Sequence, residues 1–248
     1  MRLLAWGIVA LAVTACGRVD FAPRLDASTD ASADTQPAEG GVDGADSSLR
    51  LWLPFEGSSI DVIAGRVPTC SSCPTFAQGM IAQGAVFGGA RCLRFPDESA
   101  FRLTNLTIAA WFRIDAMTLS NIVSKPFEPA TTEQNAFELF IEFDKLVFAT
   151  RPAAGTRALR GEGPIPFGEW HHVAATVEGT TARLYFNGAE IATGPTDAIV
   201  YDDAEFLVGC DMDTGSINAA LQGLLDDFRL YDRALTPAEI MTLAAGTL

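Results

Sequence analysis

The sequence predicts an all-β protein, built as a two-sheet antiparallel sandwich with one short C-terminal helix. Three observations support this fold class. From residue 50 onward, roughly a dozen short segments alternate apolar and polar residues, with turn signals between them. An Asn-Gly pair at 187–188 separates two of these segments and is a strong hairpin signal. Only the last segment has the start signals of a helix.

The predicted strands are short, and several are joined by recognisable turns. In one of them Phe137, Leu139, Ile141 and Phe143 alternate with a polar-leaning face, which indicates a half-buried strand. The segment 84–95 is read as one strand with a possible glycine bulge. The full set of predicted strands is 51–55, 84–95, 106–114, 137–143, 146–149, 170–177, 182–186, 189–193, 206–209 and 224–231.

The C-terminal helix begins with a recognisable capping sequence. Thr236 is the expected N-cap, Pro237 the first helical residue and Glu239 the partner in a capping box. Because Ile240, Leu243 and Ala244 share one helix face, we expect the helix to pack on the edge of the sandwich.

The chain is strongly acidic, with a formal net charge of −14 over 248 residues. A nucleic-acid-binding protein needs a basic surface, so the charge excludes nucleic acid as a partner. An acidic surface is compatible with calcium, which prefers oxygen ligands. Hydrophobic residues make up 48% of the chain, enough for a substantial core.

The first 17 residues resemble a bacterial lipoprotein signal. Met1-Arg2 is followed by an apolar run at 3–12, too short for a membrane-spanning helix, which needs about 20 residues. The sequence VTACG at 13–17 resembles a lipobox, which implies a signal peptide at 1–15 and lipid attachment at Cys16. The acyl chains would anchor the protein in a lipid bilayer. Gly17 is not acidic, which favours the outer membrane.

Residues 16–49 contain the lipidated cysteine and a spacer rich in Asp, Ala, Ser, Thr and Gly. Such a segment cannot bury enough apolar surface to fold, so we expect a disordered acidic tether. As a flexible coil it would hold the domain at 50–248 roughly 30 Å from the membrane.

The domain resembles the laminin G-like, concanavalin A-like lectin and glucanase superfamily, whose fold is a jelly roll. The resemblance implies that fold without a particular ligand, because the superfamily includes lectins, adhesion modules and hydrolases. The matching pieces, in order, are LWLPFE at 51–56, GAVFGG at 84–89, LTIAAWF at 106–112, GEWHHVAAT at 168–176, LYFNG at 184–188 and GLLDDFRLYDRALTPAEI at 223–240.

The resemblance also implies a structural calcium ion between the start of the domain and its closing strand. The matching ligands are Glu56, Asp61 and Asp226, although the family more often has Asp in the place of Glu56. The loop with Asp211 and Asp213 is a second acidic segment, but it lacks the rest of an EF-hand loop. The alternative is that these acids are ordinary surface residues.

Catalysis is not favoured by the sequence. Glycosidases of this architecture resemble one another in a strand E-x-D-x-x-E, and here Glu142 and Asp144 are followed by Val147 in place of the third acid. Glu138 would lie further along the same face, which we interpret as solvated. His171 and His172 are adjacent in a strand, so they point to opposite faces and cannot act together.

Four cysteines follow Cys16: Cys70, Cys73, Cys92 and Cys210. A redox pair at 70 and 73 lacks the usual βαβ context, and zinc would need a second close pair. Export favours two disulfides, with three possible connectivities. We favour Cys92 paired with Cys70 or Cys73, and Cys210 paired with the other.

The aromatic residues leave the ligand open. Trp52, Trp111 and Trp170 match core strand positions in the resemblance, whereas Phe127, Phe167 and Tyr201 fall in loops and are the candidate ligand-binding residues. The sequence thus favours a membrane-anchored, non-catalytic module of the bacterial cell envelope that binds glycan. An adhesion or structural module with an envelope or extracellular protein partner is the alternative, and a glycoside hydrolase is a less favoured one.

Overall fold

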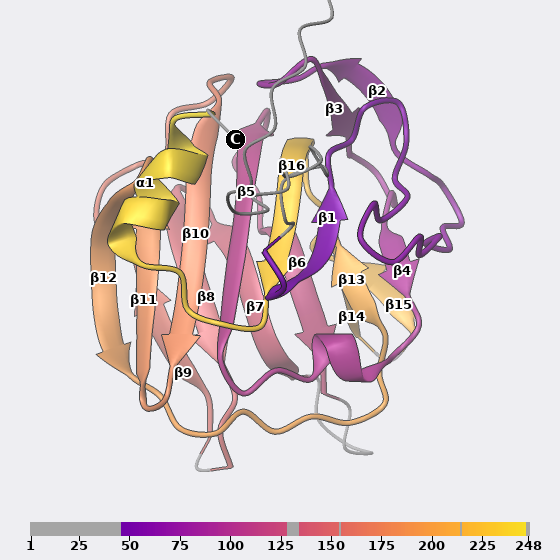
Figure 1. The fold of residues 1–248 in the computed structure, drawn as a ribbon. Coiled ribbons are helices and arrows are strands. Elements are labelled where there is room, and N and C mark those ends of the chain that lie inside the picture. The colour runs from indigo at the N-terminus through magenta and orange to yellow at the C-terminus, as the bar shows by residue number, and fades with distance from the viewer. Residues whose placement is uncertain (1–45, 128–133, 154, 214, 247–248) are drawn as a thin grey trace, which may run out of the picture. The chain divides into compact units, whose positions relative to one another are not determined.

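The computed structural model describes residues 46–127, 134–153, 155–213 and 215–246 (Figure 1). All of them belong to the compact unit formed by residues 42–248. The predicted signal peptide, Cys16 and the tether up to residue 45 lie outside the described residues. The predicted tether end at 49 is wrong by a few residues, because Asp46 pairs with Arg233 and the buried Leu49 begins β1. Within the described part of the chain, no helix is both long and apolar enough to cross a membrane.

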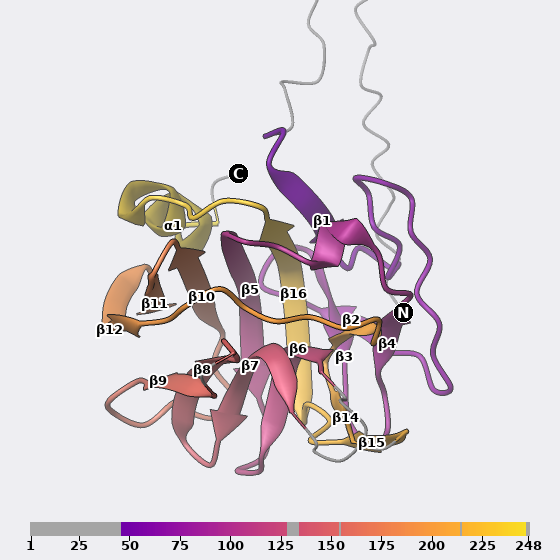
Figure 2. The ribbon, with the colours of Figure 1, turned by 90° about the horizontal axis from the view of Figure 1, so that it is seen from below.

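The domain is a two-sheet antiparallel jelly-roll sandwich, as the sequence predicts (Figures 1 and 2). The larger sheet has eight strands. Seven of them follow the order β12 (Ala189–Pro195), β11 (Thr181–Phe186), β10 (His171–Glu178), β5 (Leu106–Ile114), β16 (Gly223–Tyr231), β3 (Gln83–Val86) and β2 (Thr75–Gln78). The eighth, β1 (Leu49–Leu53), also pairs with β16. The smaller sheet has the order β4 (Leu93–Phe95), β13 (Phe206–Val208), β6 (Ser120–Pro126), β7 (Asn135–Glu142), β8 (Lys145–Thr150) and β9 (Arg157–Arg160). A separate hairpin pairs β14 (Asp211–Asp213) with β15 (Ser216–Asn218), and a 3-10 turn spans Ser99–Phe101.

The main core lies between the two sheets, which Figure 2 shows as facing layers. Alternate residues of each strand point inward, as the period of a β-strand requires, and Ile108 and Phe112 of β5 meet Phe137 and Leu139 of β7 in one buried cluster. Phe101 and Phe206 stack with their ring centroids 4.5 Å apart. This packed layer fixes the strand ends from which the loops extend.

The C-terminal helix α1 (Pro237–Ala244) has the expected capping box, in which Thr236 and Glu239 cap each other. It packs with Ile240 and Leu243 on the outer face of the eight-stranded sheet, against Tyr185, and not on the sandwich edge as the sequence predicted (Figure 2). The helix lies there because the outer face offers Ala109 and Ala174, small residues that leave room for a helix.

Two strand predictions need correction. The segment 84–95 is not one bulged strand: Gly88 and Gly89 have φ values of 142° and 63°, so the chain turns and β3 and β4 join different sheets. The strand predicted to reach Phe143 ends at Glu142, and residues 143–144 form the turn to β8. By contrast, the predicted Asn187-Gly188 hairpin is confirmed, with positive φ at both residues.

The tryptophans also differ from the expectation of core positions. Trp52 lies on the outer face of the larger sheet, where its indole Nε1 donates to Asp227 at 2.7 Å and Arg229 stacks 4.6 Å from the ring centroid. Trp111 contacts His172 rather than the main core cluster. Tryptophan spacing on a strand specifies one face, but the motif alone does not say which face is inward.

Candidate ligand-binding site

Three loops meet at one end of the sandwich, which we call the loop end: residues 115–119, 143–144 and 161–170. The backbone amide of Gly168 donates to Ile114 at 2.9 Å, and the amide of Ile165 donates to Asp144 at 3.0 Å. These bonds join the loop before β10 to the end of β5 and to the β7–β8 turn. The loops therefore form one continuous surface.

Four large apolar side chains are exposed on the loop end. They are Met117, Leu119, Phe143 and Phe167, with exposed fractions of 57%, 47%, 66% and 40%. Large apolar side chains exposed on neighbouring loops make this end a candidate binding surface.

Phe143 combines this exposure with an unfavourable backbone conformation. Its φ is 60°, in the left-handed region that strongly favours Gly, Asn or Asp. A bulky residue there costs about 1–2 kcal/mol relative to glycine. Because the ring is 66% exposed, its burial offsets little of this cost, which makes Phe143 a candidate functional residue.

The candidate aromatic residues are not gathered at one place. Phe167 lies on the loop end, as a binding residue would. Phe127 follows β6 at the other end of the sandwich, where Arg151 lies 5.6 Å from its ring centroid. Tyr201 packs on the core and donates its hydroxyl to Leu103 at 2.7 Å, so its ring is a structural element rather than an exposed platform. Burial raises the pKa of this hydroxyl.

The residue that the sequence missed is Phe143. Its place in the alternating pattern of β7 suggested a strand residue. No Gly or Asn marks the two-residue turn that the cross-strand pairing of Glu142 with Lys145 creates. The sequence predicts this turn at Asp144-Lys145, and the register places it one residue earlier, at residues 143–144.

Asp226 forms the centre of the predicted calcium site. Its side chain is fully buried, its Oδ2 accepts a hydrogen bond from the Ile81 amide at 2.7 Å, and its Oδ1 has no hydrogen-bond partner. Burial raises its pKa to about 7, and the neighbouring Asp227 carboxylate adds to the shift, against the backbone amides that lower it. A Cβ on Gly79 would lie 2.5 Å from Oδ2, so only glycine permits the turn to approach this carboxylate.

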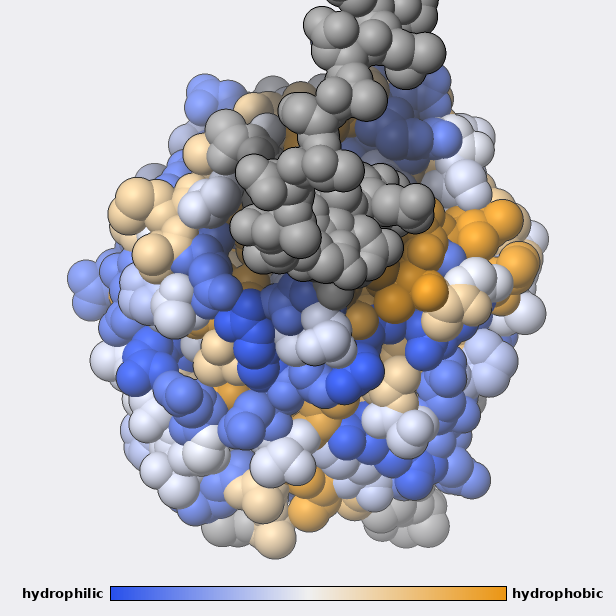
Figure 3. All heavy atoms as spheres, in the orientation of Figure 1, coloured by the Kyte–Doolittle hydropathy of each residue, from blue (hydrophilic) through white to orange (hydrophobic). Residues whose placement is uncertain are grey.

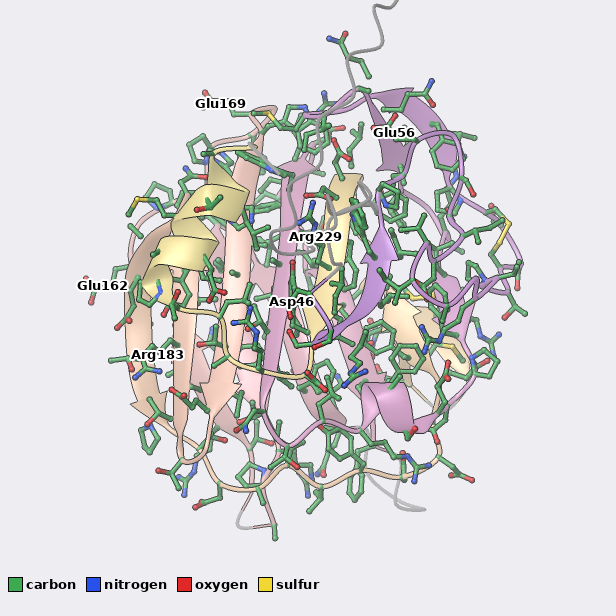
Figure 4. All side chains as sticks on the ribbon, viewed as in Figure 1. Asp46, Glu56, Glu162, Glu169, Arg183 and Arg229 are labelled. Carbon is green, nitrogen blue, oxygen red and sulfur yellow. A yellow bond between two sulfur atoms is a disulfide. The ribbon has the colours of Figure 1, made fainter. Side chains whose placement is uncertain are left out.

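Glu56 reaches the same β2–β3 turn. Its Oε2 accepts a hydrogen bond from the Gln83 amide at 3.0 Å, and the side chain is exposed. Figure 4 shows Glu56 and Glu169 at the same end of the domain. Glu56, in the loop after β1, and Asp226, on β16, thus bond the same β2–β3 turn, and Oδ1 of Asp226 is buried without a hydrogen-bond partner.

Asp61, the third predicted calcium ligand, does not offer a free carboxylate. It is fully buried and accepts hydrogen bonds from the amides of Trp52, Ile63 and Ala64. Its Oδ2 also lies 2.5 Å from Arg66. Its oxygens are therefore occupied by the protein itself, and the carboxylate serves to shape the loop after β1.

The donor set thus fits calcium only in part. Asp226 and Glu56 offer hard oxygen ligands, and the backbone of the 79–83 turn could add carbonyls. Across the described residues, no group of three or more His, Cys, Asp or Glu side chains is placed to hold a metal ion. In the second acidic loop the carboxylates already have partners: Asp213 accepts a hydrogen bond from Asn218, and Asp211 accepts one from Asn135.

A carboxylate pair lies on the outer face of the smaller sheet. Asn135 Nδ2 donates to Glu138 Oε2 at 3.1 Å and to Asp211 Oδ2 at 2.9 Å, so one amide bridges both acids. Burial raises the pKa of Glu138 to about 7, and the Asp211 carboxylate adds to the shift. Burial also raises the pKa of Asp211, opposed by hydrogen bonds from Asn135 and Ser124.

The glycosidase-like strand is not formed. Glu142 is paired with Arg160, and Asp144 lies in the turn, 3.9 Å from Lys145. Val147 belongs to the next strand, β8. The three positions of E-x-D-x-x-V therefore lie on β7, in the turn and on β8, and do not share one strand face. Glu138 is bridged through Asn135 to Asp211 and takes no part in the Glu142–Arg160 ion pair.

The two histidines point to opposite faces, as predicted. His171 packs on Phe112 and Phe186 on the core side, with ring centroids 5.9 and 4.9 Å apart. His172 lies edge-on to Trp111, and burial, with the Arg229 charge, lowers its pKa to about 4. His172 is therefore neutral at physiological pH and serves packing.

Two disulfides are present, as expected for an exported protein, but the favoured pairing is wrong. Cys92 pairs with Cys210, and Cys70 pairs with Cys73. Cys92 lies just before β4 and Cys210 just after β13, and these strands are hydrogen-bonded neighbours. The strand pairing, which the sequence does not show, decides the connectivity.

Comparison with known proteins agrees with this architecture. Residues 87–241 match the family model described as the concanavalin A-like lectin/glucanases superfamily. Human usherin is 25% identical over 170 residues, 66% of this chain but only 3% of usherin. This chain therefore spans a small part of that relative.

Solved structures show the same fold at low sequence identity. The binding domain of Paraclostridial Mosquitocidal Protein 1 has a TM-score of 0.65 at 14% identity, over 80% of this chain and 52% of that one. Domain 4 of AbnA, a GH43 extracellular arabinanase from Geobacillus stearothermophilus solved with arabinotriose, has a TM-score of 0.60 at 20% identity, over 79% and 98%. The botulinum neurotoxin serotype G binding domain has a TM-score of 0.58 at 13% identity, over 79% and 50%. The family match covers more than half of the chain, and the chain belongs to the laminin G-like branch of the concanavalin A-like lectin/glucanases superfamily.

Proposed function

We propose that this protein is a membrane-anchored, non-catalytic binding module of the bacterial cell envelope that recognises glycan through its loop end. The observation that carries the proposal is the exposed pair Phe143 and Phe167 on adjoining loops, with Phe143 held in a left-handed conformation. Aromatic rings supply large, rigid apolar surfaces that stack on the apolar faces of sugars.

The comparisons are compatible with this function. One structural neighbour is the domain of an arabinanase bound to arabinotriose, and others are receptor-binding domains of toxins. These relatives support binding in general, and the loop end supplies the aromatic surface that a sugar would use.

A bound calcium ion would stabilise the end of the domain that carries the loop end. Asp226 and Glu56 would bind the ion with carbonyls of the 79–83 turn, and the ion would supply positive charge for the buried Oδ1 of Asp226. Its role would be structural, because the exposed Phe rings and not the buried carboxylate face solvent.

Anchoring would come from the N-terminal cysteine. Acylation of Cys16 and the acidic tether would hold the domain at the outer membrane, away from the anionic surface. Two disulfides are typical of an oxidising compartment outside the cytoplasm.

A protein partner is the second candidate function, and a separate surface favours it. Ile60, Val62, Ile63 and Val67 are exposed on the loop after β1, and Figure 3 shows apolar surface beside that strand. Asp61 and Arg66 fix this loop by a partly buried ion pair, while the four aliphatic side chains remain exposed. Contiguous exposed aliphatic residues are typical of protein interfaces.

A glycan array probed with the purified full chain tests the proposal, once with calcium and once with a chelator. Binding to a defined set of glycans supports the lectin, and loss of binding with the chelator would add calcium to its structure. Absence of binding to every glycan in both conditions would contradict the proposal and favour the protein-partner function.

A further inference from the structure

The two disulfides occupy contrasting environments. Cys92 and Cys210 are 1% and 0% exposed and join positions 118 residues apart. Cys73 is exposed, Cys70 is partly buried, and the two are separated by only three positions. Ser71 and Ser72 between them are also exposed, so nothing among the described residues covers this small ring from solvent.

The segments on both sides of the small ring are held without it. The amides of Thr69 and Arg94 donate to each other's carbonyls at 2.8 and 2.9 Å. On the other side Pro74 is buried and Thr75 begins β2, which pairs with β3. Opening the ring would therefore leave the neighbouring backbone in place.

The bond also contributes less to stability than Cys92–Cys210 does by constraining the unfolded chain. A ring of about four residues restricts that chain less than a ring of about 120 residues does. An accessible disulfide that adds less stability is reduced more readily than a buried one that closes a large ring.

We propose that Cys70–Cys73 is a thiol–disulfide exchange site for an external thiol, with Cys73 as the sulfur that is attacked. An incoming thiolate forms a bond to Cys73 Sγ and the Cys70–Cys73 bond breaks, which releases Cys70 as a thiolate that takes up a proton. A second external thiolate then attacks the mixed disulfide and releases Cys73. Overall two electrons and two protons pass from the two external thiols, which become a disulfide, to the cysteine pair.

Cys73 is the expected point of attack because it is the more exposed residue, whereas Cys70 packs against the main core cluster. The external thiol has two chemical sources, a small thiol such as glutathione or a protein dithiol of an exported oxidoreductase. Both use the same attack, and they differ in the size of the group that must reach Cys73.

The test is a graded reduction of the native full chain with glutathione redox buffers and, separately, with a thioredoxin-type dithiol protein. Free thiols are alkylated at each step and assigned by peptide mass spectrometry, so that every cysteine is followed separately. We expect Cys70 and Cys73 to be labelled at reductant levels about tenfold or more below those that label Cys92 and Cys210. Far-ultraviolet circular dichroism should remain unchanged at that stage.

A matched pair of variants tests the direction of attack. Cys70→Ser leaves a free thiol at Cys73, and Cys73→Ser leaves one at Cys70. We expect the first variant to react with an aromatic disulfide reagent about tenfold faster than the second, because its thiol is more exposed. Labelling with either thiol source supports the proposal and identifies the source. Parallel reduction of both disulfides, or resistance of Cys70–Cys73 to both sources until the protein unfolds, would overturn it.

Discussion

Asp226 and Ile81 are joined by a 2.7 Å hydrogen bond from the backbone amide to the carboxylate Oδ2, while the Oδ1 of the same carboxylate is buried without a partner. This half-satisfied acid lies beside Gly79, on a turn that also holds Glu56. A buried carboxylate with a free oxygen is unstable as an anion unless a proton or a cation occupies that oxygen.

Substitution Asp226→Asn should flatten the dependence of stability on pH. Burial raises the pKa of Asp226 from 3.8 to about 7 in the folded protein, so the folded state binds this proton more tightly than the unfolded state. The resulting stability is complete at acid pH and is lost as the pH rises from 3.8 through 7. Urea unfolding at intervals across this range should show a shallower decline for the variant, by on the order of 2 kcal/mol. An unchanged decline would show that Asp226 is not the source.

Calcium should stabilise the wild type at neutral pH and not the Asp226→Asn variant. A bound ion would replace the proton of the Asp226 carboxyl, and its charge would favour the ionised form. Thermal melts with calcium and with chelator at pH 7.5 measure the difference. Equal calcium shifts in the two proteins would place any bound ion elsewhere.

Asp61→Ala should destabilise the fold by about 3–5 kcal/mol and leave the calcium response unchanged. The substitution leaves three backbone amides and the Arg66 guanidinium without their partner, because all four bond this buried carboxylate. Urea unfolding and calcium titration of the same variant separate the two effects. Loss of the calcium shift in a variant that still folds would return Asp61 to the ligand set.

Removal of each disulfide should have unequal effects on stability. Replacement of Cys92 and Cys210 by serine should cost about 5 kcal/mol, because that bond closes a long ring, and replacement of Cys70 and Cys73 should cost about 2 kcal/mol. Urea unfolding of both double variants provides the comparison. Similar losses would contradict the view that only Cys92–Cys210 is a structural bond.

Glu138→Gln should increase stability at neutral pH by about 1 kcal/mol and have little effect near pH 4. The pKa of Glu138 is about 7, raised by burial and by the Asp211 carboxylate, so the folded state favours its protonated form. Its stability contribution is likewise present at acid pH and lost as the pH rises from 4.5 through 7. The neutral amide removes that loss, and Asp211→Asn should act in the same direction, because burial also raises the pKa of Asp211 and its carboxylate adds to the Glu138 shift. A loss of stability at pH 7.5 would contradict this account.

Phe143→Asn should raise stability while it weakens glycan binding. Asn tolerates the left-handed conformation that Phe143 adopts at a φ of 60°, so about 1 kcal/mol of strain is relieved. The same change removes the exposed ring. Calorimetric unfolding and glycan binding measured on one preparation should move in opposite directions, whereas a loss of both would show that the ring supports the fold.

The sequence predicts most of the strands because their apolar residues repeat with a period of two. Residues 106–114, buried on both faces, form β5 as their run of β-prone residues predicts, and the Asn187-Gly188 hairpin follows from turn chemistry alone. The edge strands β2 and β9 are absent from the prediction because their mostly exposed residues carry no buried face to repeat. The central strand β6 is absent too, because it is buried on both faces and its sequence SNIVSKP does not alternate apolar and polar residues. Pairing decides their strand character.

The candidate site is less predictable, because it depends on contacts between distant segments. Asp226 was identified by its motif, but the ion pair of Asp61 with Arg66 and the exposure of Phe143 follow from loop conformation. The partner of Cys92 depends on the β4–β13 register in the same way. Each of these relationships is long-range or set by a turn without sequence signals.

The most direct measurement of the central claim is the affinity of the full chain for its best array glycan, compared among three proteins by calorimetry. These are the wild type, the Phe143→Ala/Phe167→Ala double variant, and Val67→Ala as a control with a similarly exposed apolar residue outside the loop end. We expect the double variant to lose about tenfold or more in affinity and the control to bind as the wild type does. Equal affinities of the wild type and the double variant would contradict glycan recognition by the loop end.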